Sequence, residues 1–119
     1  SRLMPGLAAL FGVKQSRLYI SDQFLIKYEH RPGAQAALPS HVDSSCYSFL
    51  VQLNGLDEFE GGGTRFVYAN APVSVPAGHA MLFTGRFQHE GANVTGGVRY
   101  LLAGFVTFVT PAASELQVL

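Results

Sequence analysis

The segment from residue 98 to residue 109, VRYLLAGFVTFV, constrains the fold more than any other part of the chain. Apolar residues fill most of it instead of alternating with polar ones, which is typical of a strand that is buried on both faces. A strand of this kind lies in the interior of a sheet rather than at its edge. We therefore expect a long central strand at this end of the sequence.

Most of the remaining chain reads as short strands and turns. In residues 17–29, Phe24, Ile26 and Tyr28 share one face of an alternating pattern. The segment around residue 41 reads as one strand that runs through Leu53, and glycine and proline signals separate further strands at residues 64–69, 73–75 and 79–85. Apolar residues at helical spacing occur in residues 3–12, where Gly12 is a natural stop.

Seven or eight short strands with turns between them indicate a sandwich or a barrel, of which a jelly roll is a natural case. We therefore predict an all-β fold: a double-stranded β-helix (jelly-roll) core with a short N-terminal helix. A length of 119 residues suits one domain, spanning residues 1–119.

Composition excludes several classes of protein. Hydrophobic residues make up 48% of the chain and charged residues 13%, so it is a packed domain rather than a disordered one. Eight basic and eight acidic residues give no net charge, and no basic run favours nucleic acid or an anionic membrane. No apolar stretch reaches the length of a membrane span. Cys46 is the only cysteine, which excludes an internal disulfide and is compatible with a reducing compartment such as the cytoplasm.

One short motif supplies metal ligands. His41 and Asp43 stand two residues apart in a segment that reads as a strand, so their side chains share a face. Of the other histidines, His30 lies in a Pro/Gly loop and His79 in a turn, and both are interpreted as surface residues. His89, just before the central strand, is the best third ligand. Two histidines and one carboxylate form the facial triad of non-haem Fe(II) oxygenases.

Arg99 lies inside the most apolar segment of the chain. A buried guanidinium needs a partner, because an unpaired buried charge is strongly destabilising. The carboxylate of a small molecule would satisfy it through two parallel hydrogen bonds. The alternative is a structural ion pair with an acid from elsewhere in the fold.

These motifs, in this order, resemble the Fe(II)/2-oxoglutarate-dependent oxygenases of the prolyl-4-hydroxylase-like branch. The resemblance spans residues 18–109 and rests on His41-x-Asp43, FEGGGTRF, PAGHAMLF, His89-x-Gly91 and VTGGVRYLLAGF, which carries Arg99. It implies that His41, Asp43 and His89 bind Fe(II), that Arg99 binds the distal carboxylate of 2-oxoglutarate, and that O₂ and ascorbate take part. Tyr28 and Gln52 fall where the family often places residues that face the co-substrate, although each suits an ordinary core position as well.

The resemblance further implies hydroxylation of an unactivated C–H bond with release of succinate and CO₂. It suggests a prolyl or lysyl side chain in a peptide or protein as the substrate, or a small molecule. Nucleobases are disfavoured because the chain lacks tryptophan and any basic cluster. Arg31 and Arg86 are the candidate substrate contacts. Two alternatives remain: a jelly-roll metal isomerase or hydrolase with the same ligands, and a non-catalytic binding module.

Two further expectations concern the surroundings of the site. Tyr47, Phe49, Val51 and Leu53 share a strand face that is too apolar for water, whereas the chain supplies only one helix to cover it. We therefore expect a fragment of a longer protein that carries more supporting helices at the N-terminus. The glycines at residues 61–63 are interpreted as a turn rather than a phosphate cradle, since no helix follows them.

Overall fold

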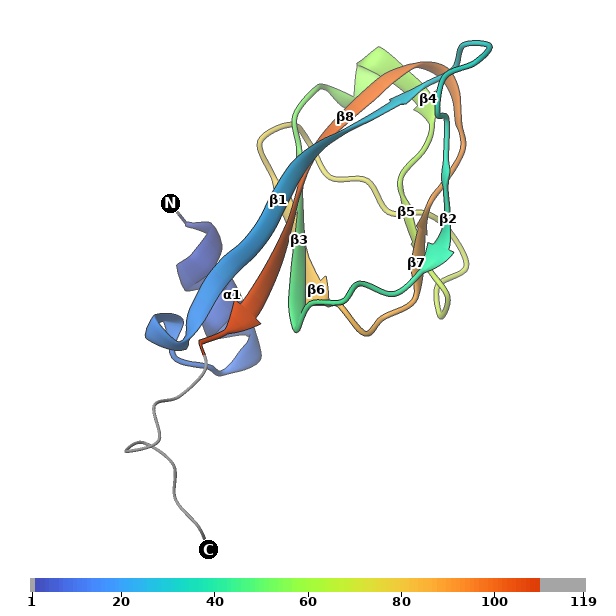
Figure 1. Cartoon of the computed structure of the whole chain (residues 1–119). Coiled ribbons are helices and arrows are strands. Elements are labelled where there is room, and N and C mark those ends of the chain that lie inside the picture. Colours follow the sequence, from blue (N-terminus) through green and yellow to red (C-terminus); the bar gives the residue numbers. More distant parts are fainter. Residues whose placement is uncertain (1, 110–119) are drawn as a thin grey trace, which may run out of the picture.

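The computed structural model describes residues 2–109 and consists mainly of antiparallel strands (Figure 1). No helix within these residues is long and apolar enough to cross a membrane. In chain order the elements are the helix α1 (Leu3–Phe11), the short 3-10 helix η1 (Gln15–Arg17), β1 (Leu18–Glu29), β2 (Leu38–His41), β3 (Tyr47–Gln52), the 3-10 helix η2 (Leu56–Glu58), β4 (Phe59–Gly61), β5 (Thr64–Phe66), β6 (Ala80–Thr84), β7 (His89–Gly91) and β8 (Val94–Phe108).

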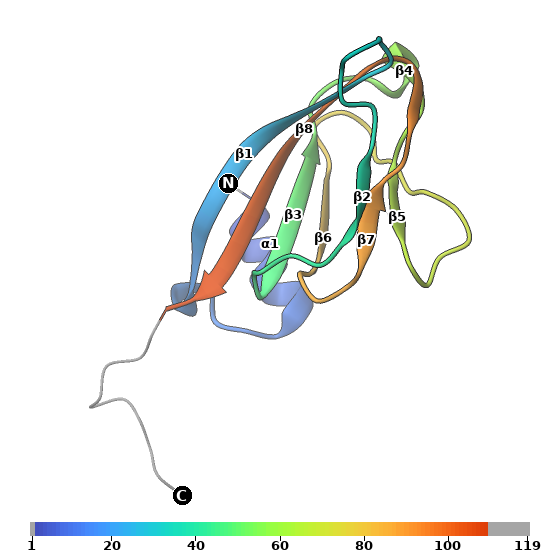
Figure 2. The same ribbon diagram turned by 45° about the vertical axis from the view of Figure 1, so that its right-hand side comes forward.

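The strands form two sheets that face each other (Figure 2). The larger sheet has the order β1-β8-β3-β6, and β4 pairs with the first residues of β8; the smaller sheet has the order β2-β7-β5. The apolar segment at residues 98–109 falls almost entirely within β8, which lies between β1 and β3 as its two apolar faces predicted. The predicted all-β architecture with one N-terminal helix is confirmed.

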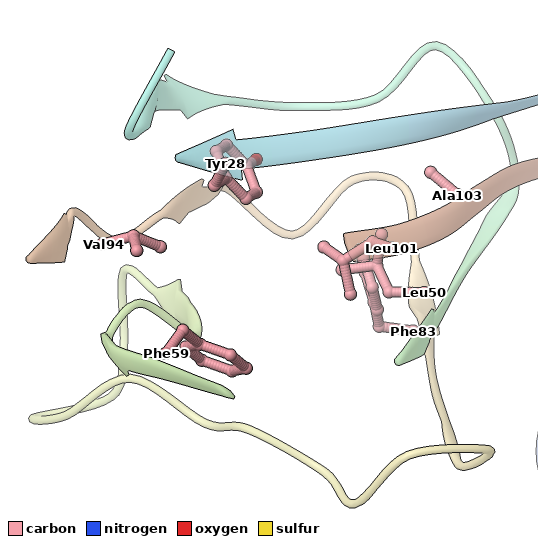
Figure 3. Close-up of a cluster of buried hydrophobic side chains, with 7 residues drawn as sticks. All are labelled: Tyr28, Leu50, Phe59, Phe83, Val94, Leu101 and Ala103. Atoms are coloured by element: carbon pink, nitrogen blue, oxygen red, sulfur yellow. The ribbon is translucent and has the colours of Figure 1, made fainter. Parts of the chain in front are cut away.

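Alternation along the strands divides the apolar residues between two clusters. One cluster fills the space between the sheets and contains Tyr28, Leu50, Phe59, Phe83, Val94, Leu101 and Ala103 (Figure 3). The other lies on the outer face of the larger sheet, where Leu7 and Ala8 of α1 pack against Phe49 and Val106. The expectation that helix must cover this face is therefore correct for α1. The helix ends at Gly12, which has the left-handed φ of 67°.

Two strand predictions were wrong. The strand expected to run from residue 41 through Leu53 is interrupted, because residues 42–46 leave the smaller sheet and cross to the larger one. Residues 73–75 are not a strand either: Val73 makes a single bridge with Thr64. Prolines at residues 72 and 76 flank this segment, and proline cannot donate to a ladder.

Candidate metal and co-substrate site

The smaller sheet brings two histidines together. His41 ends β2 and His89 begins β7, and the two residues are direct partners across the antiparallel pair. Cross-strand partners share a face, and the two imidazole rings lie with their centroids 4.4 Å apart. Asp43 follows in the crossing segment, where its N–H donates to the carbonyl of Gly85 at 2.8 Å. The segment that crosses between the sheets thus brings the carboxylate to the two rings.

The three side chains present their ligand atoms to one point. Asp43 Oδ1 lies 3.4 Å from His41 Nε2 and 3.6 Å from His89 Nε2, and the candidate ligand atoms all lie within 4.8 Å of one another. The three residues that the sequence proposed as a ligand set are therefore neighbours. His30 and His79 are exposed and lie outside this cluster.

Hydrogen bonds around the cluster orient these atoms. His41 Nδ1 lies 2.7 Å from the carbonyl oxygen of Pro39, and His89 Nδ1 lies 2.7 Å from that of Phe87. A carbonyl only accepts, so each contact places a proton on Nδ1, and Nε2 is the ring nitrogen left to act as a metal ligand. Asp43 Oδ2 accepts from Ser48 Oγ at 2.5 Å, which directs Oδ1 toward the histidines. Such outer partners are the usual means of orienting metal ligands.

The cluster opens into a pocket between the sheets. Asp43 and His89 are buried, whereas the side chain of His41 keeps 33% of its surface exposed. These three residues line the pocket together with Phe24, Phe105, Tyr28 and Thr64. Figure 3 shows the Tyr28 side chain directed into the space between the sheets. A small molecule in this pocket can therefore reach both the ligand cluster and the residues that surround Arg99.

Arg99 is completely buried. Its Nε donates to Gln52 Oε1 at 3.3 Å and its Nη2 donates to Thr64 Oγ1 at 3.5 Å, while Nη1 is buried with no hydrogen-bond partner among residues 2–109. The ring of Tyr28 lies 5.8 Å from the guanidinium carbon. No acid within the described residues pairs with Arg99, so these residues do not provide the structural ion pair that was the alternative reading.

Burial sets the electrostatics around Arg99. Desolvation lowers the pKa of Arg99, because a guanidinium in an apolar interior loses its hydration. Desolvation raises the pKa of Tyr28, and the charge of Arg99 opposes that shift only in part. The Tyr28 hydroxyl therefore stays protonated at neutral pH and remains a donor. A carboxylate beside Arg99 would supply the missing negative charge and a partner for Nη1.

The other predicted site residues lie further out. Gln52 is buried beside Arg99 but does not line the pocket; its amide nitrogen donates to the backbone carbonyl of Asn54 at 3.0 Å. Arg31 is exposed and pairs with Glu29, and Arg86 is exposed after β6. The structure therefore places both arginines on the surface, and neither lines the pocket.

The glycine run ends β4 and links it to β5, and no helix follows it in the described part of the chain. Gly61, Gly62 and Gly63 all have positive φ, between 70° and 95°. At Gly62 a side chain would crowd Val94 and Arg99. The run thus lets the chain pass closely over β8 where Arg99 lies.

Comparisons of this chain with known proteins identify its relatives. No family model matches the chain. Human multifunctional procollagen lysine hydroxylase and glycosyltransferase LH3 is 43% identical over 107 residues, which cover 86% of this chain and 14% of that protein. Mouse procollagen-lysine,2-oxoglutarate 5-dioxygenase 1 is 39% identical over 108 residues, 87% of this chain and 15% of that protein. The chain is a relative of the 2-oxoglutarate-dependent oxygenases. It spans about one seventh of the length of these relatives.

A solved structure supports the same relationship for the fold. The oxygenase-like core superimposes on an oxidoreductase of the 2OG-Fe(II) oxygenase family from Burkholderia pseudomallei, with a TM-score of 0.72 and 17% identity. The match covers 90% of this chain and 51% of that one. The resemblance drawn from the sequence motifs and the predicted jelly-roll fold are both confirmed.

Two residues of this oxygenase-like site were not predicted. Ser48 positions the Asp43 carboxylate, and Thr64 contacts Arg99. Alternation along β3 puts Ser48 on the same strand face as Gln52, which was a usable signal, but the partner of Ser48 comes from the segment that crosses between the sheets. Thr64 gave no signal, because a single threonine beside a glycine run is common in turns.

Proposed function

We propose that this chain is the catalytic domain of an Fe(II)- and 2-oxoglutarate-dependent dioxygenase that hydroxylates lysyl side chains in a peptide or protein. One observation carries the proposal: two histidines and one aspartate line the same pocket as the residues that contact a buried arginine. One N–H group of this arginine has no partner within residues 2–109. The first feature suits a metal and the second suits a carboxylate. We also propose that residues 1–119 form one oxygenase domain.

The ligand cluster fits Fe(II). His41, Asp43 and His89 would hold the ion from one side, which leaves further coordination positions open. With 2-oxoglutarate and O₂, bound Fe(II) supplies the oxidation of an unactivated C–H bond, with release of succinate and CO₂. The chain's own share is to fix the three ligands through Ser48 and two backbone carbonyls. The apolar walls of the pocket exclude water from the reacting groups.

The buried arginine fits the co-substrate. Arg99 would bind the distal carboxylate of 2-oxoglutarate, because Nη1 is free to donate and no acid neutralises the guanidinium within residues 2–109. Tyr28 and Thr64 would flank the same carboxylate, since both line the pocket and both contact Arg99. Gln52 holds the guanidinium from the side away from the pocket. It is therefore a positioning residue in this proposal.

The names of the relatives favour lysine among the substrates that the motifs allowed. Those proteins are called procollagen lysine hydroxylases or procollagen-lysine,2-oxoglutarate 5-dioxygenases. We infer that a lysyl side chain in a peptide or protein is the substrate here, ahead of prolyl residues and small molecules. Ascorbate as the reductant remains a prediction from the resemblance.

The decisive experiment follows succinate formation by the full chain with Fe(II), ascorbate, 2-oxoglutarate and a lysine-containing peptide, together with mass analysis of the peptide. We expect succinate and a peptide that is heavier by one oxygen atom. A metal isomerase or hydrolase would be indifferent to 2-oxoglutarate, and a non-catalytic module would bind it without forming succinate. Either result would contradict the proposal.

A further inference from the structure

One row of residues crosses the larger sheet at the level of the metal cluster. Asp22 of β1 pairs with Phe105 of β8, Phe105 pairs with Ser48 of β3, and Ser48 donates to the ligand Asp43. Neighbouring strands are about 4.8 Å apart, so the backbones of Asp22 and Ser48 lie roughly 10 Å apart. The row therefore joins the rim of the pocket to the cluster.

Two aromatic residues form a pair at this row: Phe105 belongs to it, and Phe24 lies next to it on β1. Phe24 and Phe105 both line the pocket, with their ring centroids 5.4 Å apart and their planes at 77°. Phe24 keeps 38% of its surface exposed, although it shares a strand face with the fully buried Tyr28. An aromatic pair with one exposed ring and one partly buried ring next to the metal cluster offers an apolar wall and a ring face to a ligand that enters the pocket.

A bulge turns Asp22 toward the pocket. Ile20 pairs with Val106, which belongs to the outer cluster under α1, whereas Asp22 pairs with the pocket residue Phe105. The extra residue between them is Ser21, whose hydroxyl contacts the carbonyl of Phe105 at 3.2 Å and Thr107 Oγ1 at 3.0 Å. One inserted residue exchanges the faces of a strand. Asp22 therefore shares the inner face with Phe24, whereas Ile20 faces outward.

Asp22 does not itself line the pocket; it lies on the inner strand face next to the lining residue Phe105 and brings an unneutralised charge there. It is exposed, and within residues 2–109 no basic side chain makes an ion pair with it. The basic residue of β1, Lys27, lies five residues further along the strand and pairs with Glu29. A carboxylate on the same inner strand face as an aromatic pair suits a ligand with an apolar stem and a positive end.

We propose that Asp22, Phe24 and Phe105 form the subsite that recognises the cationic side chain of the substrate. This inference rests on the proposed function and adds the residues that select lysine. The aliphatic stem of lysine would lie along the two rings, and its ammonium group would meet Asp22. The relatives are named 5-dioxygenases, which points to carbon 5 of lysine as the atom to be hydroxylated. Carbon 5 is two bonds from the side-chain nitrogen, about 2.5 Å at ordinary bond lengths. An acid at the pocket rim can therefore hold the ammonium while carbon 5 faces the cluster.

The test is a binding measurement that does not depend on turnover. Fluorescence anisotropy would follow a labelled glycine-rich peptide with one lysine, and the same peptide with norleucine, on the full chain with Mn(II) and 2-oxoglutarate. We expect Asp22→Asn to weaken binding of the lysine peptide about two- to fivefold, as for an ion pair at an exposed site. It should leave the norleucine peptide unchanged. Asp57→Asn, which removes another exposed acid that lies on η2 rather than on β1 next to Phe105, is the matched control and should change neither.

Two further variants sharpen the result. Phe24→Leu should weaken both peptides, because the wall serves the stem rather than the charge. Asp22→Lys should reverse the preference, so that a glutamate peptide binds better than the lysine peptide. Melting curves of each variant establish that the chain is folded.

Equal binding of the lysine and norleucine peptides by the unmodified chain would overturn the inference, as would the absence of binding to either. An unchanged preference in Asp22→Asn would overturn it too. Succinate formation by the unmodified chain without peptide tests the proposed function independently of the lysine subsite. Lysine preference without succinate contradicts the function alone, and succinate without lysine preference contradicts the subsite alone.

Discussion

His41 and His89 offer the same ligand atom from different surroundings. The side chain of His89 keeps 7% of its surface exposed and packs against Phe83, whereas that of His41 keeps 33% exposed at the pocket opening. Both are held by a backbone carbonyl two residues earlier. The geometry of the centre is therefore defined most firmly at His89, while His41 lies where ligands enter.

Replacement of a ligand should remove metal binding. We expect His89→Ala to lower the affinity for Mn(II), used as a stable substitute for Fe(II), by at least about tenfold, since a facial site has only three protein ligands. Titration followed by electron paramagnetic resonance measures this. His79→Ala is the control, because His79 is exposed and outside the cluster. Equal Mn(II) affinity in the two variants would show that His89 is not a ligand.

Arg99 gives the second prediction for a single residue. We expect Arg99→Ala to weaken 2-oxoglutarate binding by about 2–5 kcal/mol, mostly because the remaining carboxylate would be buried without a partner. Arg99→Lys should recover only part of this, since an ammonium cannot present two parallel donors. Calorimetric titration of folded protein measures both. Arg31→Ala, which removes an exposed arginine, should retain the affinity. Unchanged binding in Arg99→Ala would contradict the assignment.

The residues of the candidate site were predictable to different degrees. The two histidines, the aspartate and Arg99 could be found because their side-chain chemistry is unusual for their position, and because the order of the surrounding motifs resembles one family. Ser48 and Thr64 could not, because a hydroxyl has a role only through the groups that the fold brings to it. Asp22 was also missed, since the bulge at Ser21 that turns it inward leaves no mark in the alternation of β1.

Among the elements, the strands with clear alternation or continuous apolar character were predicted well. The long β8 and the inward face of β1 follow from their patterns. The break at residues 42–46 was not seen, because alternation inside one segment does not reveal a change of sheet. That break carries Asp43 to the two histidines, so the ligand set was identified although its strand was drawn wrongly.

The helix α1 provides a prediction at this scale. Leu7 is fully buried against the outer face of the larger sheet, while Leu10 on the same helix is 61% exposed. We expect Leu7→Ala to lower the free energy of unfolding by about 2–5 kcal/mol, through lost burial and the cavity left behind. Leu10→Ala should change it by less than about 0.5 kcal/mol. Urea unfolding followed by circular dichroism gives both values, and equal values would mean that α1 does not cover the sheet.

In the whole molecule, the candidate site joins the two sheets. His41 and His89 come from the smaller sheet, Arg99 and Tyr28 come from the larger one, and Asp43 lies in the segment between them. Polar side chains from both sheets lie around the pocket, and one buried N–H group of Arg99 has no partner within residues 2–109. A metal and a dicarboxylate would connect both sheets through the same pocket.

Ligands should therefore stabilise the whole fold in two separable steps. A ligand at about 100 times its Kd stabilises the folded state by about 2.7 kcal/mol, provided that it does not bind the unfolded chain. We expect Mn(II) alone to raise the melting temperature of the full chain, and 2-oxoglutarate to raise it further once Mn(II) is present. In Arg99→Ala the rise with Mn(II) should persist and the added rise with 2-oxoglutarate should disappear, whereas in His89→Ala both should be lost. Differential scanning calorimetry of the three proteins, with Mg²⁺ and succinate as control ligands, measures each step.

A rise in melting temperature with 2-oxoglutarate that is equal in Arg99→Ala and the unmodified chain would place the co-substrate away from Arg99. If His89→Ala lost the rise with Mn(II) but kept the rise with 2-oxoglutarate, the two ligands would occupy independent sites. In a shared centre the metal must be bound before the dicarboxylate can connect the sheets.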